Sequence, residues 1–224
     1  MFIGHFGVAL AAKRAAPHLS LGTLLLAAQL PDLIWPTLVL LGVETVRIAP
    51  GDTAVSPLEF VSYPYSHSLL SAVALGAVFA LVVWALARSW TSAAVAWASV
   101  VSHWVLDAIS HRPDLPLLPG GAGRVGLGLW NSVAGTAALE GLVFAAAVAV
   151  YVRATAARDR AGVVGLWAVV ALLAAIYVAS LGGAPPPSAA AIAWVGQSGW
   201  LFVLWGFWLD RHRPTRQRGA SVAA

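Results

Sequence analysis

The chain lacks cysteine and has little charge. Without cysteine, disulfide bonds and thiolate metal ligands are excluded. Only 10% of the 224 residues are Asp, Glu, Lys or Arg, whereas a soluble domain carries roughly 25%. Hydrophobic residues make up 60% of the chain, and the mean hydropathy is +0.82. This composition excludes an ordinary soluble domain and predicts an integral membrane protein.

The N-terminus also lacks the charge pattern of a cleaved signal peptide. A signal peptide carries positive charge before its apolar stretch. Here Lys13 and Arg14 follow the apolar stretch 2–12. That stretch is too short to cross a bilayer, which takes about 20 residues. We therefore expect it to form a short half-helix.

Longer apolar runs predict about six transmembrane helices, and hence an all-α, polytopic helical bundle. The expected spans are 19–42, 66–87, 92–110, 129–152, 163–182 and 189–209. With the N-terminal half-helix they are expected to form a single transmembrane domain over residues 1–210. Residues 211–224 are expected to form a basic cytoplasmic tail without fixed structure.

Basic residues predict which side of this bundle faces the cytoplasm. With six spans and both termini inside, the inner side holds Lys13, Arg14, Arg88, Arg153, Arg158, Arg160, Arg211, Arg213, Arg216 and Arg218. The outer side holds only Arg47, Arg112 and Arg124. This bias follows the positive-inside rule and predicts a multi-pass protein of the bacterial inner membrane. The basic tail could also bind nucleic acid or anionic lipid, but its role in setting the topology accounts for its charge. We therefore expect the lipid bilayer as partner and expect no binding of nucleic acid.

A few ionisable residues lie within the apolar spans, where they are costly and usually functional. They are His5, Asp32, His67, His103, Asp107, His111 and Glu140. With a rise of about 1.5 Å per helical residue, these positions fall in the middle to outer half of the bilayer. Residues from different segments are therefore expected to share one zone.

Three of these residues lie in SHWVLDAISH, residues 102–111. His103, Asp107 and His111 are four residues apart, so they form one stripe on a helix. Two imidazoles and a carboxylate suit Zn²⁺, and less decisively Mn²⁺ or Fe²⁺. A proton relay and a hydrogen-bond network between helices are the alternatives.

The candidate site follows from these residue types. The expected metal ligands are His5, Asp32, His67, His103, Asp107 and His111. Asp32 and Glu140 are the candidate catalytic carboxylates, as proton acceptors. Glu140 could instead pair with Arg112 or Arg124. Three serines could orient the imidazoles, namely Ser66, Ser68 and Ser102.

The order of these residues resembles the YdjM-like family of LexA-regulated inner-membrane proteins. The resemblance rests on His5, on Asp32 in a Pro-Asp dipeptide, on His67 in Ser-His-Ser, and on His103 with Asp107 in HxxxD. It covers about residues 1–115, and GLGLWNSVAGTAALE at 126–140 resembles a signature of a subgroup. The family is described as metal-dependent hydrolases, so the resemblance implies that activity.

A more distant likeness joins the chain to zinc-dependent phospholipase C and P1-nuclease-like enzymes. It implies that Asp32, His67, His103 and Asp107 hold one metal, and that His5 with Asp107 holds another. In those enzymes the N-terminal amine is also a ligand, which places Met1 near the site. The chain lacks their later HxxxE motif, so we expect one or two metals.

These inferences predict a metal-dependent hydrolase acting on a phosphoester or lipid-linked substrate at the outer half of the bilayer. Arg112 and Arg124 could steer an anionic head group. The alternative is a non-catalytic protein with a structural metal site or a role in metal or proton transport. The inner half of the third span, TSAAVAWASVV, offers only small hydroxyls, which disfavours a path through the membrane. The sequence leaves the oligomeric state open.

Overall fold

The computed structural model describes residues 1–120 and 123–216 of the chain. Within these residues, five helices are long and apolar enough to cross a membrane. They are α5 (Leu69–Ala87), α6 (Trp90–Ser110), α7 (Val133–Ala154), α8 (Arg160–Ser180) and the stretch Ala189–His212, which contains α9 (Ala189–Gly196) and α10 (Gly199–His212). A bent pair, α2 (Leu21–Ala28) and α3 (Leu30–Leu40), makes a sixth candidate. The predicted polytopic helical bundle is confirmed.

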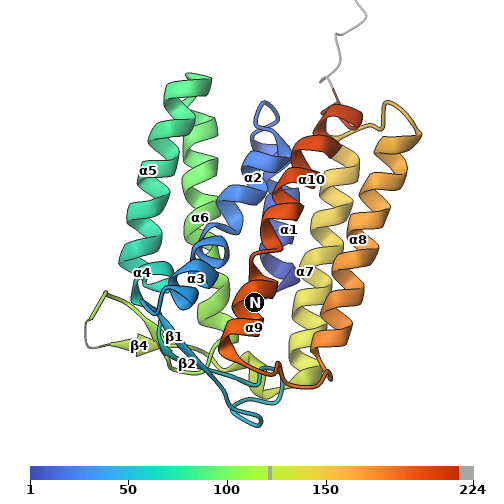
Figure 1. The fold of residues 1–224 in the computed structure, drawn as a ribbon. Coiled ribbons are helices and arrows are strands. Elements are labelled where there is room, and N and C mark those ends of the chain that lie inside the picture. Colours follow the sequence, from blue (N-terminus) through green and yellow to red (C-terminus); the bar gives the residue numbers. More distant parts are fainter. Residues whose placement is uncertain (121–122, 217–224) are drawn as a thin grey trace, which may run out of the picture.

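The helices form two outer pairs around a central group (Figure 1). Helices α5 and α6 pack together on one side, and α7 and α8 lie on the other. Between them lie α1 (Ile3–Ala15), the pair α2–α3, and the pair α9–α10. Helix α1 is the expected half-helix, and it is enclosed by α2, α6 and α7 rather than lying at the surface.

Several spans begin at a side chain that caps the helix. Ser20, Ser68, Ser89, Ser132, Asp159 and Ser188 each accept a hydrogen bond from the backbone N–H three residues later. Such caps satisfy donors that have no partner within the helix. The capping residues therefore determine locally where α2 and α5 to α9 begin.

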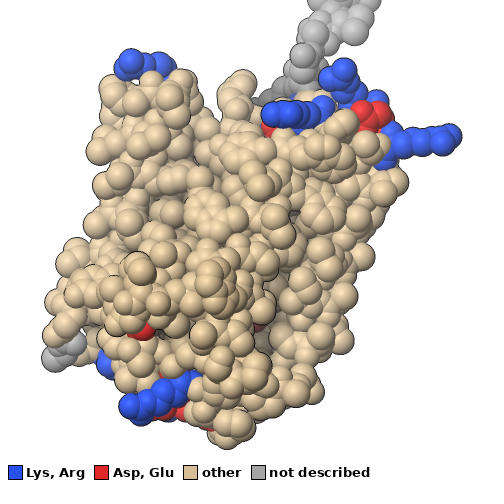
Figure 2. Space-filling model, in the orientation of Figure 1, with Lys and Arg blue, Asp and Glu red and all other residues tan. Residues whose placement is uncertain are grey.

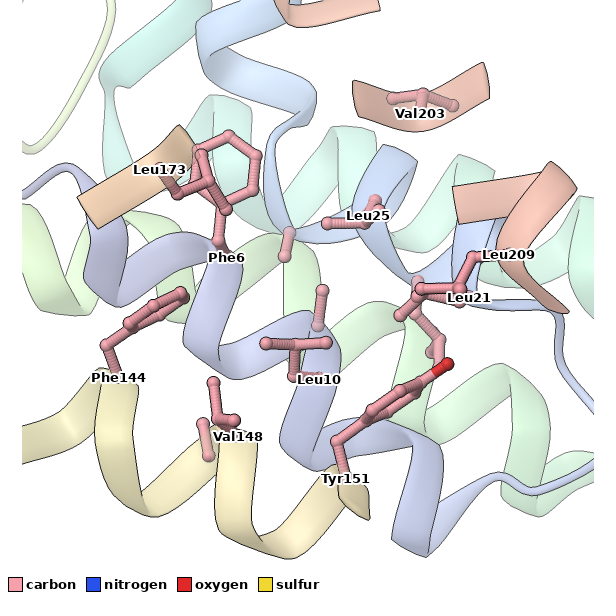
Figure 3. Packing of buried hydrophobic residues seen from close by; sticks show 14 of the residues in the cluster. Phe6, Leu10, Leu21, Leu25, Phe144, Val148, Tyr151, Leu173, Val203 and Leu209 are labelled. Atoms are coloured by element: carbon pink, nitrogen blue, oxygen red, sulfur yellow. The ribbon is translucent and has the colours of Figure 1, made fainter. Parts of the chain in front are cut away.

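The main core lies where α1, α2, α7, α8 and α10 meet (Figure 3). Phe6 and Leu10 of α1 pack there with Phe144 of α7 and Leu25 of α2. The close approach of α2 to α10 depends on glycine: a Cβ added to Gly206 would lie 3.0 Å from the backbone of Gly22. Small residues of this kind let membrane helices pack closely.

The connections between the expected spans contain two short hairpins. Strand β1 (Thr45–Ile48) pairs antiparallel with β2 (Leu58–Ser62), and β3 (Leu115–Pro116) pairs with β4 (Arg124–Val125). A four-residue helix, α4 (Pro64–His67), follows β2, and a 3₁₀ turn (Leu129–Asn131) precedes α7. The hairpins cover the end of the bundle that lies opposite the C-terminal end of α10 (Figure 1).

Charged side chains gather at the two ends of the bundle, and the visible face between them is almost uncharged (Figure 2). One end carries Arg88 after α5, Arg153 in the last turn of α7 and Arg211 in the last turn of α10. The other end carries Arg47 and Arg124 of the hairpins. The grouping expected from the sequence is present, and the assignment of the more basic end to the cytoplasm remains a prediction from charge bias.

The first residue of the chain and its last described residues lie in different settings. Met1 is buried within the bundle, not at either charged end (Figure 1). Helix α10 continues to His212, and the Arg213 Nε donates a hydrogen bond to the Thr155 Oγ1 at 2.8 Å. The first part of the predicted tail is therefore ordered, because it pairs with the α7–α8 connection. Its residues 217–224 lie outside the described residues.

Candidate metal centre

Side chains from α1, α3, α4 and α6 converge at one buried point. Two groups of possible ligands share His103: His5 with Asp107, and Asp32 with His67. Within each group the candidate ligand atoms all lie within 4.8 Å of one another. The structure therefore brings together five of the six metal ligands predicted from the sequence.

A broken helix orients His103. The break between α2 and α3, a bend of 56°, leaves the Ala28 carbonyl at the end of α2 free to accept. The His103 Nδ1 lies 2.8 Å from this oxygen. A carbonyl oxygen can only accept, so Nδ1 carries the hydrogen. The Nε2 of the neutral ring then presents a lone pair towards the site.

The same break places Asp32. This residue is in the first turn of α3, beside Pro31, which lacks the N–H that a continuous helix would need. The Asp32 Oδ1 lies 3.3 Å from the His67 Nε2 and 3.6 Å from the His103 Nε2. The Pro-Asp dipeptide thus supplies both the carboxylate and the interruption that frees the Ala28 carbonyl.

A chain of hydrogen bonds orients His67. The Ser66 hydroxyl donates its only hydrogen to the Glu44 Oε2 at 2.6 Å. The Ser66 Oγ also lies 2.7 Å from the His67 Nδ1, so that nitrogen must be the donor. The His67 Nε2 is left with a lone pair that faces Asp32.

Glu44 also holds the short helix α4 in place. Its Oε1 accepts hydrogen bonds from the backbone N–H groups of Tyr65 and Ser66 at 2.8 and 2.9 Å. The carboxylate is buried, at 2% exposure. One residue therefore fixes the position of α4 and the tautomer of the histidine that ends it.

Asp107 faces both groups. Its Oδ1 accepts a hydrogen bond from the Met1 amine and lies 3.1 Å from the His5 Nε2. Its Oδ2 lies 3.3 Å from the His103 Nε2 and 3.8 Å from the His67 Nε2. The rings of His5 and His103 stack at 3.7 Å. The two carboxylate oxygens of Asp107 thus face His5 on one side and His103 with His67 on the other.

The chemistry of this donor set fits a cation. Two carboxylates and the lone pairs of two oriented imidazoles point at the same small space. The Met1 amine offsets part of their repulsion at Asp107, and a bound cation would offset the rest. Within the described residues the buried His103 Nε2 has no hydrogen-bond partner, and it faces carboxylate oxygens of Asp107 and Asp32 at 3.3 and 3.6 Å. Imidazole and carboxylate are the ligands that Zn²⁺ binds in many proteins.

A cavity of about 470 Å³ adjoins the cluster. Asp32, His67 and Asp107 line one end of it. The Asp32 side chain is 40% exposed, whereas His103 and Asp107 are almost fully buried. Asp32 is therefore the group of this cluster that meets the cavity most openly.

His111 belongs to a different cluster. Its Nδ1 lies 3.1 Å from the Asp114 Oδ1, and the Tyr63 hydroxyl donates to the same oxygen at 3.0 Å. Arg112 lies at 3.1 Å from the other oxygen of Asp114. Burial alone would raise the pKa of Asp114, but these hydrogen bonds outweigh it and hold the pKa below its usual value. Burial and the nearby Asp114 charge raise the pKa of Tyr63.

Glu140 lies beside the histidine–aspartate cluster but outside both groups of possible ligands. Its Oε2 accepts hydrogen bonds from the backbone N–H groups of Phe2 and Gly4, at 2.7 and 3.3 Å. The alternative that it pairs with Arg112 or Arg124 is wrong: Arg112 pairs with Asp52 and Asp114, and Glu140 satisfies the free donors at the start of α1 instead.

Sequence reasoning missed Glu44, which sits in a polar connection with no motif around it. Of the three serines expected to orient imidazoles, only Ser66 contacts one. Ser68 caps α5, and the Ser102 hydroxyl donates to the Ser99 carbonyl within its own helix.

Fold and site together define a class: a multi-pass helical membrane protein with a buried histidine–aspartate cluster. The chain matches the family model described as YdjM inner membrane protein over residues 1–183. It belongs to this family, and the match extends well beyond the region 1–115 expected from the motifs. The family and the apolar helices indicate a multi-pass protein of the inner membrane. No curated protein and no solved structure matches the chain.

Proposed function

We propose that the chain is a membrane-embedded, metal-dependent hydrolase that acts on a phosphoester, in a lipid-linked substrate, at the outer half of the bilayer. The observation that carries this proposal is the convergence of Asp32, Asp107 and the oriented Nε2 atoms of His67 and His103 beside a cavity.

The proposed metal ligands are Asp32, His67, His103 and Asp107, with His5 and Asp107 able to hold a second ion. Zinc is the favoured metal, with manganese or iron as alternatives. Such an ion supplies a bound water of lowered pKa and polarises the attacked group. Asp32 is the favoured proton acceptor, because it is the most exposed carboxylate of the cluster. Glu140 is a weaker candidate, because backbone N–H groups occupy its Oε2.

Two non-catalytic functions compete with hydrolysis. A structural metal site is usually closed by four protein ligands and has no reason to adjoin a cavity. A transporter needs a polar path to the other face, but along α1 the core residue Leu10 lies between His5 of the site and Lys13 of the basic end. Both observations favour hydrolysis.

Metal content tests the proposal first. The C-terminally tagged protein is purified in detergent, and its metals are measured by plasma mass spectrometry beside a His103→Ala/Asp107→Ala variant and a His111→Ala variant. We expect one or two equivalents of metal in the parent protein and in His111→Ala, and none in the double variant.

A hydrolysis assay follows on the same three preparations, after reloading with zinc or manganese. The probes are bis(p-nitrophenyl) phosphate and phosphatidylglycerol in mixed micelles. We expect release of product only from the preparations that hold metal. No metal in the reloaded parent protein, or equal metal in a folded double variant, contradicts the proposal.

A further inference from the structure

The lining of the cavity beside the cluster is mostly apolar, with a group of polar residues where it meets the cluster. These polar residues include Asp32, His67, Asp107 and Glu140. Apolar side chains form its walls: Phe2, Phe6, Leu33, Pro36, Ile192 and Phe202. Its volume, about 470 Å³, lies within the roughly 300–1,000 Å³ typical of small-molecule sites. This arrangement suits an amphiphile with its polar group at the cluster.

The rim of the cavity lies on two helices that pack on different neighbours. Ile176, Ala179 and Ser180 line it from the outer part of α8, and Ile192 and Val195 line it from α9. Helix α9 packs mainly on α3, whereas its continuation α10 packs on α2 and α8. Figure 2 shows the surface hollowed between α9 and α8. The cavity therefore has an opening in the side of the bundle, between α8 and α9, and it also reaches the hairpin end, where Ser56, Leu58 and Trp130 line it.

The side chains around this opening are those of a lipid-facing surface. Val178 is 67% exposed, Val195 is 64% exposed and Leu201 is 64% exposed. All three lie on spans long and apolar enough to cross a membrane. In water such exposed apolar groups would be unfavourable, but within a bilayer they face acyl chains. The opening thus faces the hydrocarbon core of the membrane, so the groups that can enter it are lipid acyl chains.

We propose that this cavity holds the acyl chain of a membrane phospholipid, which enters sideways between α8 and α9. The acyl chain of the lipid packs against Phe6, Leu33 and Phe202, and the phosphate end of the lipid reaches Asp32 and His67. The position of the phosphate rests on the proposed function, whereas the site for the acyl chain does not. A substrate held in this way never leaves the bilayer to reach a site buried within the bundle.

Photo-crosslinking tests this site directly. The protein is placed in nanodiscs of phosphatidylethanolamine and phosphatidylglycerol, doped with a phosphatidylethanolamine that carries a diazirine near the end of one acyl chain. After irradiation, labelled peptides are quantified by mass spectrometry relative to peptides of α5, whose exposed side chains report ordinary contact with lipid. We expect enriched label on residues 176–186 and 192–202.

Two variants on α8 form a matched pair. Ala179→Trp puts a large ring at the rim, whereas Val178→Trp puts the same ring on the adjacent exposed position, which does not line the cavity. We expect Ala179→Trp to lower the relative label about tenfold or more, as for a pocket that loses room for part of its ligand. Val178→Trp should leave it unchanged.

Label spread evenly over all exposed helices, or lowered equally by both variants, overturns the proposed lipid site. The experiment is repeated on His103→Ala/Asp107→Ala to separate the two proposals. If neither the parent protein nor the double variant holds metal, but both keep the enriched label, the acyl-chain site is supported and the hydrolase proposal is contradicted. If the parent protein holds metal but shows no enriched label, the metal site is supported and the acyl-chain site is contradicted.

Discussion

The two halves of the bundle treat buried charge differently. At the basic end, the Lys13 Nζ donates to the Asp210 Oδ1 at 2.5 Å and to the Leu19 carbonyl at 2.6 Å. The same Asp210 oxygen accepts from the Leu21 N–H at 3.2 Å. Every charge in this group has a partner of opposite sign or a suitable donor, and α1, α2 and α10 are tied together by it.

At the other half, the carboxylates of Asp32 and Asp107 both face the His103 Nε2, and the Met1 amine donates to Asp107 but not to Asp32. Asp32 and Asp107 face imidazole nitrogens whose hydrogens are committed elsewhere, to Ala28 and Ser66. A group with all its bonds made contributes to stability, whereas an incompletely satisfied buried group usually marks a functional site. The comparison therefore separates a structural cluster, Lys13 with Asp210, from the proposed metal-binding cluster around His103, called the binding cluster below.

Breaking the pair at the basic end should have the largest effect on stability. We expect Lys13→Ala to lower the free energy of unfolding by about 2 kcal/mol, below the roughly 3–5 kcal/mol of a fully buried pair. The smaller value follows because the Asp210 side chain is 24% exposed. Chemical unfolding in mixed micelles measures the change. The metal content of the folded protein should not alter.

The double variant Lys13→Met/Asp210→Leu is the control for this prediction. It removes both charges and keeps apolar bulk, so much of the lost stability should return. If Lys13→Ala instead loses metal while remaining folded, the two clusters are coupled and the separation drawn above is wrong.

Ser66→Ala should weaken the binding cluster with less effect on the fold. The change removes the acceptor of the His67 Nδ1–H. It leaves the hydrogen bonds that the Glu44 carboxylate accepts from the backbone N–H groups of Tyr65 and residue 66. Loss of a partner that orients a ligand commonly costs 10–100-fold in metal affinity, so we expect about tenfold, or about 1.4 kcal/mol. Competition with a chromophoric chelator measures the affinity.

Ser102→Ala provides the matched control, because the Ser102 hydroxyl bonds within its own helix, one residue before His103. We expect its metal affinity to equal that of the parent protein. Equal weakening in both variants would show that Ser66 acts through general stability and not through the His67 ring.

Most of the bundle could be predicted from the sequence, because long apolar runs and capping residues report helices locally. The departures have local causes as well. Gln29 and Pro31 divide the first expected span into α2 and α3, and Ser198 lies at the break between α9 and α10. The hairpins were missed because short paired strands depend on contacts between segments that composition does not show.

The candidate site could be predicted where burial made a polar residue unusual. His5, Asp32, His67, His103 and Asp107 stand out because apolar spans rarely contain such groups. Glu44 could not be found in this way, because it lies in a polar connection and is buried only through tertiary structure. His111 followed the helical spacing of four, but α6 ends at Ser110, and its ring turns to Asp114.

The cluster of Tyr63, His111 and Asp114 sharpens the comparison, because it lies near the binding cluster yet is paired like the structural one. The pKa of Asp114 in the folded protein is below its unfolded value. Its contribution to stability is therefore present above the unfolded pKa, and is lost as the pH falls through the folded pKa. We expect Asp114→Asn to lower the free energy of unfolding by about 1 kcal/mol near neutral pH. This difference from the parent protein should shrink as the pH falls below about 4.

Unfolding of both proteins in mixed micelles across this pH range measures the difference, with metal content recorded for each. Asp159→Asn is the control: hydrogen bonds from His212 and the Gly162 N–H also lower the pKa of Asp159, but the Asp159 side chain is 43% exposed, so salt should remove most of its smaller effect. Loss of metal from a folded Asp114→Asn protein would place His111 and Asp114 with the binding cluster. Retained metal with the expected pH dependence would show that a buried polar group acts here through its pairing, not through its nearness to the site.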